Sequence, residues 1–184
     1  ASMGLWLPTL NFDDNAGHLI LPSQLASDGY YHLDVSSQMW ALAPWLNNAL
    51  HAVGAVLAGE EVRAAVNRIR LLFGAYAAYR LTMSLTEDKE LSLLSSAIYL
   101  SHPFVTYLST SMQVDGITAA VFMSLLAYVV RHEGRVDSAI LLGVLFGFMA
   151  GLKSSNVVYA ILPLGYVCYQ NIKLKKYRAL IGMF

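Results

Sequence analysis

Hydrophobic and polar positions alternate in long blocks along this chain. Four apolar blocks cover residues 69–85, 91–108, 117–130 and 139–169, and short polar segments separate them. The last block would form a straight helix of about 46 Å, longer than a hydrocarbon core of about 30 Å, so two short helices broken at 153–156 fit it better. Pro103 predicts a bend in the second block, because proline donates no backbone hydrogen bond. The pattern therefore predicts about five transmembrane helices.

The polar region before these blocks, residues 12–62, contains one further helical pattern over residues 41–58. Pro44 suits its first turn and Gly59 suits its end. Its apolar residues recur at helical spacing and are Leu42, Trp45, Leu46, Leu50, Val53 and Leu57. A helix with one apolar face and a polar face is typical of a surface helix, and we expect this one to lie on the membrane.

Composition supports the same interpretation. Of 184 residues, 57% are hydrophobic and 13% are charged, whereas an average soluble domain has about 25% charged residues. We therefore expect an all-α, polytopic membrane protein in which residues 1–184 form a single transmembrane domain. Both ends of the sequence are apolar, so we expect it to be incomplete there. The net charge of +0 gives no indication of a nucleic-acid partner.

The basic residues predict an orientation. Residues 12–62 contain no lysine or arginine, and Arg63 is the first basic residue of the chain. Residues 171–178 contain Lys173, Lys175, Lys176 and Arg178. Because basic loops stay in the cytoplasm, we expect the first region to be an extracytoplasmic loop and the second to be cytoplasmic. This topology predicts an integral protein of the plasma, or inner, membrane with its polar site on the extracytoplasmic side.

An acidic pair, Asp13 and Asp14, opens the polar region, and His18 follows Asp14 by four residues. Adjacent carboxylates could act as an acid and base or bind a metal. The simpler interpretation is a solvated turn or a helix N-cap, where aspartate is favoured. His18 could equally be a helix-face partner of Asp14.

Three further polar residues fall on the same predicted side of the membrane: His102, Asp115 and Lys153. Polar groups in such places are costly and often functional. Each also has a structural interpretation. His102 could bond the backbone that Pro103 frees, Asp115 could cap the following helix, and Lys153 could be a boundary lysine.

The order of these motifs resembles the GT-C superfamily of membrane glycosyltransferases, which includes protein O-mannosyltransferases and the lipid A aminoarabinose transferase. The resemblance extends over about residues 12–170. Its elements are the acidic pair Asp13-Asp14, the helix after Ala43-Pro44, Ser101-His102-Pro103, Gln113-Val114-Asp115-Gly116, and the glycine-rich run from Gly147 to Lys153. The usual acidic pair of that family is Asp-Glu, and here it is Asp-Asp.

The resemblance implies transfer of a sugar from a polyprenyl-phosphate-linked donor to an acceptor. Asp13 or Asp14 would be the catalytic base, and Asp115 a second carboxylate that orients the acceptor or a metal. Lys153 would contact the donor phosphate, with His18 and His102 as further substrate-binding residues. The leaving phosphate needs a cation, which can be a side chain or a divalent metal, so the metal requirement stays open.

A function from another class also fits the sequence. The chain could be a non-catalytic membrane module, either part of a transporter or a scaffold subunit of a membrane complex. A transporter favours charged groups near the bilayer midplane. The acidic groups here lie in and beside the predicted outer loops, which favours the transferase.

Overall fold

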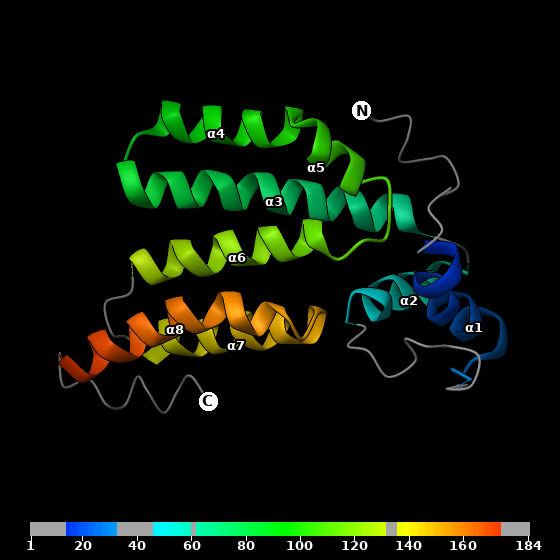
Figure 1. Ribbon diagram of the computed structural model, residues 1–184. Helices are drawn as coiled ribbons and strands as arrows, with labels where there is room; N and C mark the ends of the chain where they lie inside the picture. The colour runs from blue at the N-terminus through cyan, green and yellow to red at the C-terminus, as the bar shows by residue number, and fades with distance from the viewer. Residues whose placement is uncertain (1–13, 33–45, 60–61, 132–135, 174–184) are drawn as a thin grey trace.

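The computed structural model describes residues 14–32, 46–59, 62–131 and 136–173 (Figure 1). Within these ranges the chain forms a π-helical turn, η2 (Asp14–His18), and eight α-helices, with no β-strand. The candidate Asp13 lies outside the described residues. The helices are α1 (Ile20–Asp28), α2 (Leu46–Ala58), α3 (Arg63–Thr86), α4 (Lys89–Ser101), α5 (Pro103–Leu108), α6 (Asp115–Val130), α7 (Val136–Leu152) and α8 (Asn156–Lys173).

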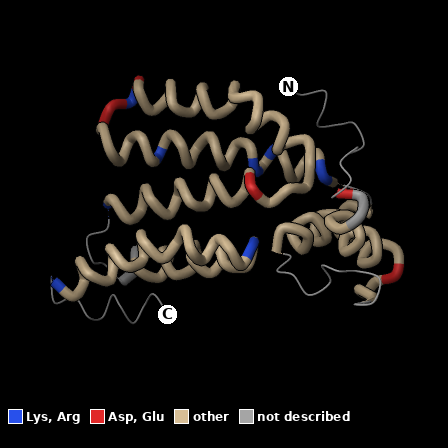
Figure 2. The backbone as a smooth tube through the Cα atoms, viewed as in Figure 1, with Lys and Arg blue, Asp and Glu red and all other residues tan. Residues whose placement is uncertain are grey.

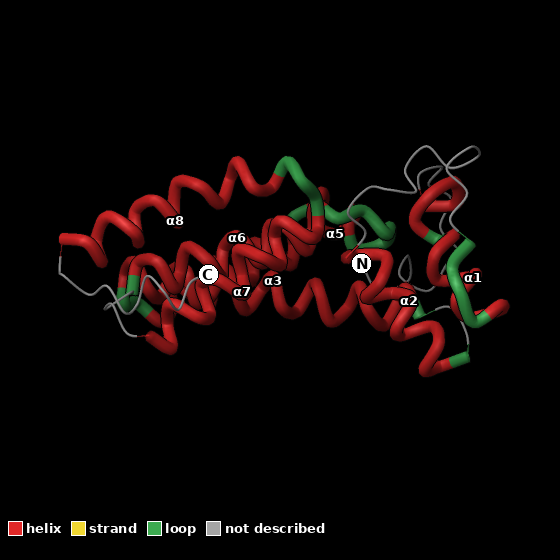
Figure 3. Tube along the Cα trace, turned by 90° about the horizontal axis from the view of Figure 1, so that it is seen from below, coloured by secondary structure: helices red, strands yellow, loops and turns green. Residues whose placement is uncertain are grey.

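Five of these helices form a bundle, the short α5 contacts α4 and α6 at one end of it, and two helices lie beyond that end. Helix α3 contacts α4 on one side and α6 on the other, and α6 also contacts α7 and α8. Helices α1 and α2 contact each other and lie at the end of the bundle where α3 and α6 begin (Figures 1 and 3). The segment 109–114 between α5 and α6 is at the same end of the bundle, because α3 and α6 both start there.

Local chemistry explains where α4 and α5 begin. The Asp88 side chain accepts hydrogen bonds from the backbone N–H groups of Glu90 and Leu91, at 2.8 and 3.0 Å, which caps α4. The break expected at His102 and Pro103 is present. His102 has an extended backbone, as a residue before proline prefers, and its Nδ1 accepts a hydrogen bond from Phe104 N at 3.2 Å, which caps α5.

The hydrophobic core lies between α6, α7 and α8. Helix α6 contributes one face of residues at helical spacing: Ile117, Val121, Leu125 and Val129. Helices α7 and α8 pack against this face with Ala139, Leu142, Met149, Leu152, Ala160 and Val167. On the other side, α3 is lined by the small residues Gly74, Ala75, Ala77 and Ala78, which are buried. Small side chains allow the neighbouring helices to approach α3 closely.

The prediction of a polytopic membrane protein with about five transmembrane helices is wrong. In the described part of the chain, no helix combines the length and the apolar sequence that a membrane crossing requires. The most apolar helices, α6 and α7, have 16 and 17 residues, whereas a crossing takes about 20. Helix α3 is long enough at 24 residues but contains four arginines. The predicted location in the plasma membrane rested on these crossings and is therefore no longer supported.

The surface helix expected over residues 41–58 is present as α2, and residues 41–45 lie outside the described chain. Its apolar stripe does face outward, because Val53 is 60% exposed and Leu57 is 82% exposed. The opposite face is buried and contains two polar residues, Asn47 and His51. This helix is therefore held to the protein in part through polar groups.

Charged residues are distributed unevenly over the fold. Lysine, arginine, aspartate and glutamate lie mostly at the two ends of the bundle, and the middle parts of the helices are largely uncharged (Figure 2). One charged end is formed by the turn between α3 and α4. The other end is where α1 and α2 meet the bundle, and it contains the candidate site.

Candidate functional site

A buried polar cluster lies where α2 and α3 meet the segment between α5 and α6. Its members are each at most 8% exposed and come from three separate parts of the chain: Asp14, Asn47, His51, Arg63, Asn67 and Arg70. Buried polar groups are costly unless they form hydrogen bonds. The bonds of this cluster show what it holds in place.

Four consecutive backbone carbonyls, those of residues 110–113, each accept a hydrogen bond from a different side chain. On α3, Asn67 Nδ2 donates to the Ser111 oxygen at 2.8 Å, and Arg70 Nη2 donates to the Gln113 oxygen at 2.6 Å. Arg63 also donates to Thr110, and Asn47 of α2 to Met112. We call this arrangement the carbonyl clamp. It fixes an irregular segment that leads directly into Asp115 at the start of α6.

Asp14 completes the clamp from the N-terminal side. It is fully buried, and both of its carboxylate oxygens lie 3.0 Å from the backbone nitrogen of Met112, which donates to them. A carboxylate in this position has a structural role, because it satisfies a backbone N–H that would otherwise be buried without a partner. From the sequence Asp14 is a candidate base; in the structure its carboxylate binds the backbone N–H of Met112 in segment 110–113.

His51 and Arg70 form a buried contact inside the cluster. Arg70 Nη1 lies 3.2 Å from His51 Nε2. A guanidinium only donates hydrogen bonds, so His51 Nε2 must be the acceptor and the imidazole is neutral. Burial, followed by the positive charges of Arg70 and Arg63, lowers the pKa of His51 to about 3. Burial also lowers the pKa of Arg70 to about 10, although the nearby Asp14 charge opposes this shift.

His18 lies beside the cluster and bonds a partner that the sequence did not indicate. Its Nδ1 is 2.8 Å from Asn48 Oδ1 on α2. From the four-residue spacing, a helix-face contact with Asp14 is one of the alternatives. The four-residue spacing places two residues on one face only in an α-helix. Here the turn is π-helical, because Leu19 N donates to the Asp14 backbone oxygen at 2.9 Å, five residues back.

Asp115, at the start of α6, and Lys153, in the turn between α7 and α8, are both exposed, and α6 contacts both α7 and α8. Asn156, at the start of α8, donates from Nδ2 to Thr118 Oγ1 at 3.0 Å and to the Met149 oxygen at 3.2 Å. Thr118 follows Asp115 by three residues and so shares its face of α6. The turn that contains Lys153 is therefore held against the first turn of α6.

The end of α7, just before Lys153, also contacts α2. A side chain at Gly151, two residues before Lys153, would lie 3.2 Å from Leu46 of α2. Leu46 is next to Asn47, which belongs to the carbonyl clamp. The start of α6, the end of α7 and the start of α2 thus meet at one place. His102 is exposed as well, but its Nδ1 is used in capping α5.

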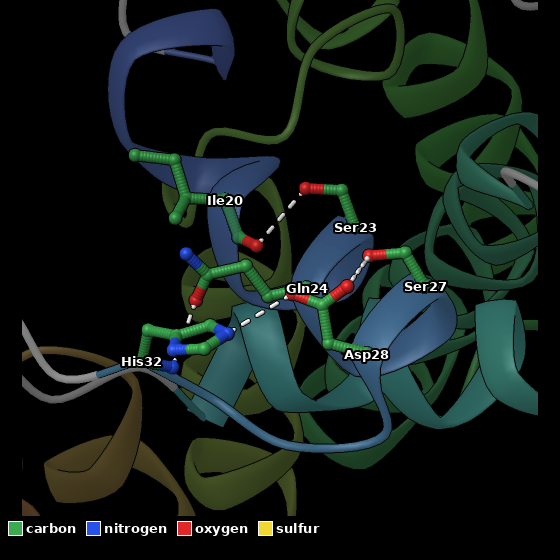
Figure 4. Close-up of polar contacts among 6 residues, drawn as sticks. All are labelled: Ile20, Ser23, Gln24, Ser27, Asp28 and His32. Atoms are coloured by element: carbon green, nitrogen blue, oxygen red, sulfur yellow. Dashed lines mark hydrogen bonds and ion pairs between the residues drawn. The ribbon is translucent and has the colours of Figure 1, made fainter.

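A second polar group closes the end of α1. His32 Nε2 lies 3.0 Å from Asp28 Oδ2, and Ser27 Oγ donates to Asp28 Oδ1 at 2.8 Å (Figure 4). The backbone nitrogen of His32 also donates to Gln24 Oε1 at 3.0 Å. The hydrogen bond from Ser27, and then that from His32, lower the pKa of Asp28. All of these groups are close in sequence and lie in or just after the last turns of α1, which ends before the left-handed Gly29.

All four residues that donate to the clamp were missed from the sequence: Asn47 on α2, and the three α3 residues Arg63, Asn67 and Arg70. The spacing of the α3 residues does carry a signal, since positions i, i+4 and i+7 lie on one face of a helix. Asn47 and His51 show the same four-residue spacing on α2. A polar stripe on an otherwise apolar helix is the pattern that identifies such residues.

Within the ranges that the structure describes, no three histidine, cysteine, aspartate or glutamate side chains are grouped closely enough to hold a metal ion. No protein-family model, no curated protein and no solved structure matches this chain.

Proposed function

We propose that this chain forms the donor-binding part of a glycosyltransferase that uses a polyprenyl-phosphate-linked sugar. Asp115 acts as the base and Lys153 contacts the donor phosphate. One observation carries the proposal: Asp115 and Lys153 are both exposed and belong to adjacent elements that Asn156 joins. The order of the sequence motifs is similar to that of the GT-C superfamily, and this similarity supports the proposal independently of the structure.

The chemistry of sugar transfer needs one carboxylate and one cation. The acceptor hydroxyl or amine loses a proton as it attacks the anomeric carbon, and the Asp115 carboxylate can accept that proton. The bond from the anomeric carbon to the phosphate oxygen breaks at the same time. Lys153 stabilises the negative charge that the leaving phosphate gains.

The carbonyl clamp gives Asp115 a fixed starting point. Its four hydrogen bonds hold the backbone up to Gln113, two residues before Asp115. Catalytic groups act best when their supporting residues are fixed in advance. In this proposal Asp14 is a positioning residue, since its buried carboxylate binds Met112.

Replacement of Lys153 by glutamine tests the phosphate contact. A hydrogen bond to a charged group contributes about 1.5–3 kcal/mol, so K153Q should bind a polyprenyl-phosphate analogue about tenfold more weakly or worse. The matched control is K89Q, because Lys89 is also exposed but lies at the start of α4, at the other end of the bundle. Equal affinity of K153Q and K89Q would remove the phosphate contact from the proposal.

Replacement of Asp115 by asparagine tests the base. Release of polyprenyl phosphate from a sugar-loaded donor should fall by about 10²–10⁴, while binding of the unloaded analogue stays unchanged. Asp88 is unsuitable as a control because it caps α4, so E90Q, in the same exposed turn, is preferred. Full turnover in D115N would contradict the assignment.

A second candidate function is supported by the outer surface of the bundle. Large apolar side chains are exposed along α3, α4 and α8, among them Ile69, Leu72, Leu93, Leu94, Val158 and Leu162. Such surfaces often mark interaction sites. A non-catalytic module, such as a scaffold subunit, would keep its partner binding in both D115N and K153Q, which distinguishes it from the transferase.

A further inference from the structure

A small pocket lies between α3, α4, α5 and α6, behind the carbonyl clamp. Its volume is about 20 Å³, which is enough for one water-sized atom. The residues that line it are Asn67, Arg70, Leu71, Tyr99, Val105, Leu108, Ser109 and Gly116. Four of these eight are polar residues, namely Asn67, Arg70, Tyr99 and Ser109.

Arg70 brings a positive charge to this pocket. Its side chain is 8% exposed, and three of its bonds are accounted for, to His51, Asn67 and Gln113. A guanidinium has five N–H donors, so two form no hydrogen bond to the described residues. No carboxylate of a described residue lies within 4.0 Å of Arg70. A buried cation is costly unless it is well paired; Asp14 is near enough to favour the charge of Arg70, and an anion beside the two remaining donors would stabilise it further.

Two further groups make the pocket favourable for negative charge. Tyr99 lines it, and the Tyr99 hydroxyl makes no hydrogen bond to any described residue, although a Cβ added at Gly74 on α3 would overlap it. Gly116 lines it from the first turn of α6, which no side chain caps. The start of an α-helix carries a partial positive charge and free N–H groups.

We propose that this pocket binds a small anion, either chloride or one oxygen of a carboxylate, through Arg70 and the Tyr99 hydroxyl. The pocket is too small to hold a whole phosphate group or sugar. The inference does not depend on the proposed glycosyltransferase function, because neither Asp115 nor Lys153 lines the pocket.

Replacement of Tyr99 by phenylalanine tests the site in the intact chain. The ring is kept and one donor to the anion is lost, so the affinity for chloride should fall about tenfold or more. The control is Y107F, because Tyr107 is 53% exposed on α5 and does not line the pocket. Chloride binding is measured from the NMR line width of the chloride ion, and sodium acetate is added as a competitor.

Salt affects the wild-type protein, Y99F and Y107F equally through screening, so only a difference between the variants is informative. Chloride binding that is weakened in Y99F and kept in Y107F would support the site. Displacement of chloride by acetate would then show that the pocket also accepts one carboxylate oxygen, whereas no displacement would restrict the pocket to halides. Absence of chloride broadening in the wild type, or equal affinity in Y99F and Y107F, would overturn the proposal.

Discussion

The neutral, buried His51 makes the stability of this fold depend on pH in a defined range. Its pKa is about 3 in the folded chain, against an ordinary value of about 6.5 in the unfolded chain. Between these two values the unfolded state binds one more proton than the folded state. Stability is therefore fully present above pH 6.5 and is lost as the pH falls toward 3.

The magnitude follows from the size of the shift. Each pH unit below 6.5 costs about 1.4 kcal/mol, so at pH 4.5 His51 alone should lower the free energy of unfolding by about 3 kcal/mol. This is a large part of the 5–15 kcal/mol that is typical of a folded domain. The carboxylates contribute mainly at lower pH, because their ordinary pKa values are near 4.

Urea unfolding at several pH values between 4.5 and 7.5 measures this effect. The variant H51Q removes the titrating group. Between pH 4.5 and 6.5 its free energy of unfolding should therefore fall less steeply with decreasing pH than that of the wild type, by about 1.4 kcal/mol per pH unit. H102Q is the control, because His102 is exposed. The comparison uses the slope with pH, so an overall loss of stability in H51Q does not affect it. An equal slope in wild type and H51Q would refute the argument.

Three further predictions concern local packing and helix ends. Gly74→Ala should lower the free energy of unfolding by about 1–3 kcal/mol, because its Cβ would overlap the ring and hydroxyl of Tyr99. Tyr99→Ala is itself costly, so Gly74→Ala is also measured in a Tyr99→Ala background, where it should cost little. An equal cost in both backgrounds by thermal unfolding would contradict the overlap. A Cβ added at Gly147 on α7 would meet no described atom within 4 Å. Gly147→Ala should therefore raise the free energy of unfolding by about 0.5–1 kcal/mol, and thermal unfolding would detect this gain. Asp88→Ala should cost about 1 kcal/mol through loss of the α4 cap, and an unchanged unfolding midpoint would show that the cap contributes nothing.

The positions of several helices could be predicted because their causes are local. Pro103 breaks a helix wherever it lies in the chain, since its nitrogen has no hydrogen to donate. The break at 153–156 followed from the length of the apolar block, and α7 does end at Leu152. The membrane prediction was wrong because neither the apolar blocks nor the overall composition determines where each helix begins and ends. A crossing depends instead on uninterrupted helix length, which α6 and α7 lack.

The carbonyl clamp could not be predicted from spacing. Its hydrogen bonds join residues that are 43 to 98 positions apart in the sequence, and no local pattern specifies such partners. The sequence did indicate that Asp14 and Asp115 need an explanation. It could not show that Asp14 is buried while Asp115 is exposed, because burial depends on how the helices pack.

The bond between Asp14 and Met112 has a consequence for the order of folding. It closes a loop of 98 residues, and long loops cost more conformational entropy to close than short ones. Helices α3 and α4 meet through a short turn and can pair early, whereas the turn at Asp14 can dock only after segment 110–113 is in place. We therefore expect the Met112 amide to gain protection from hydrogen exchange late in folding and to report when the N-terminal part of the chain has docked.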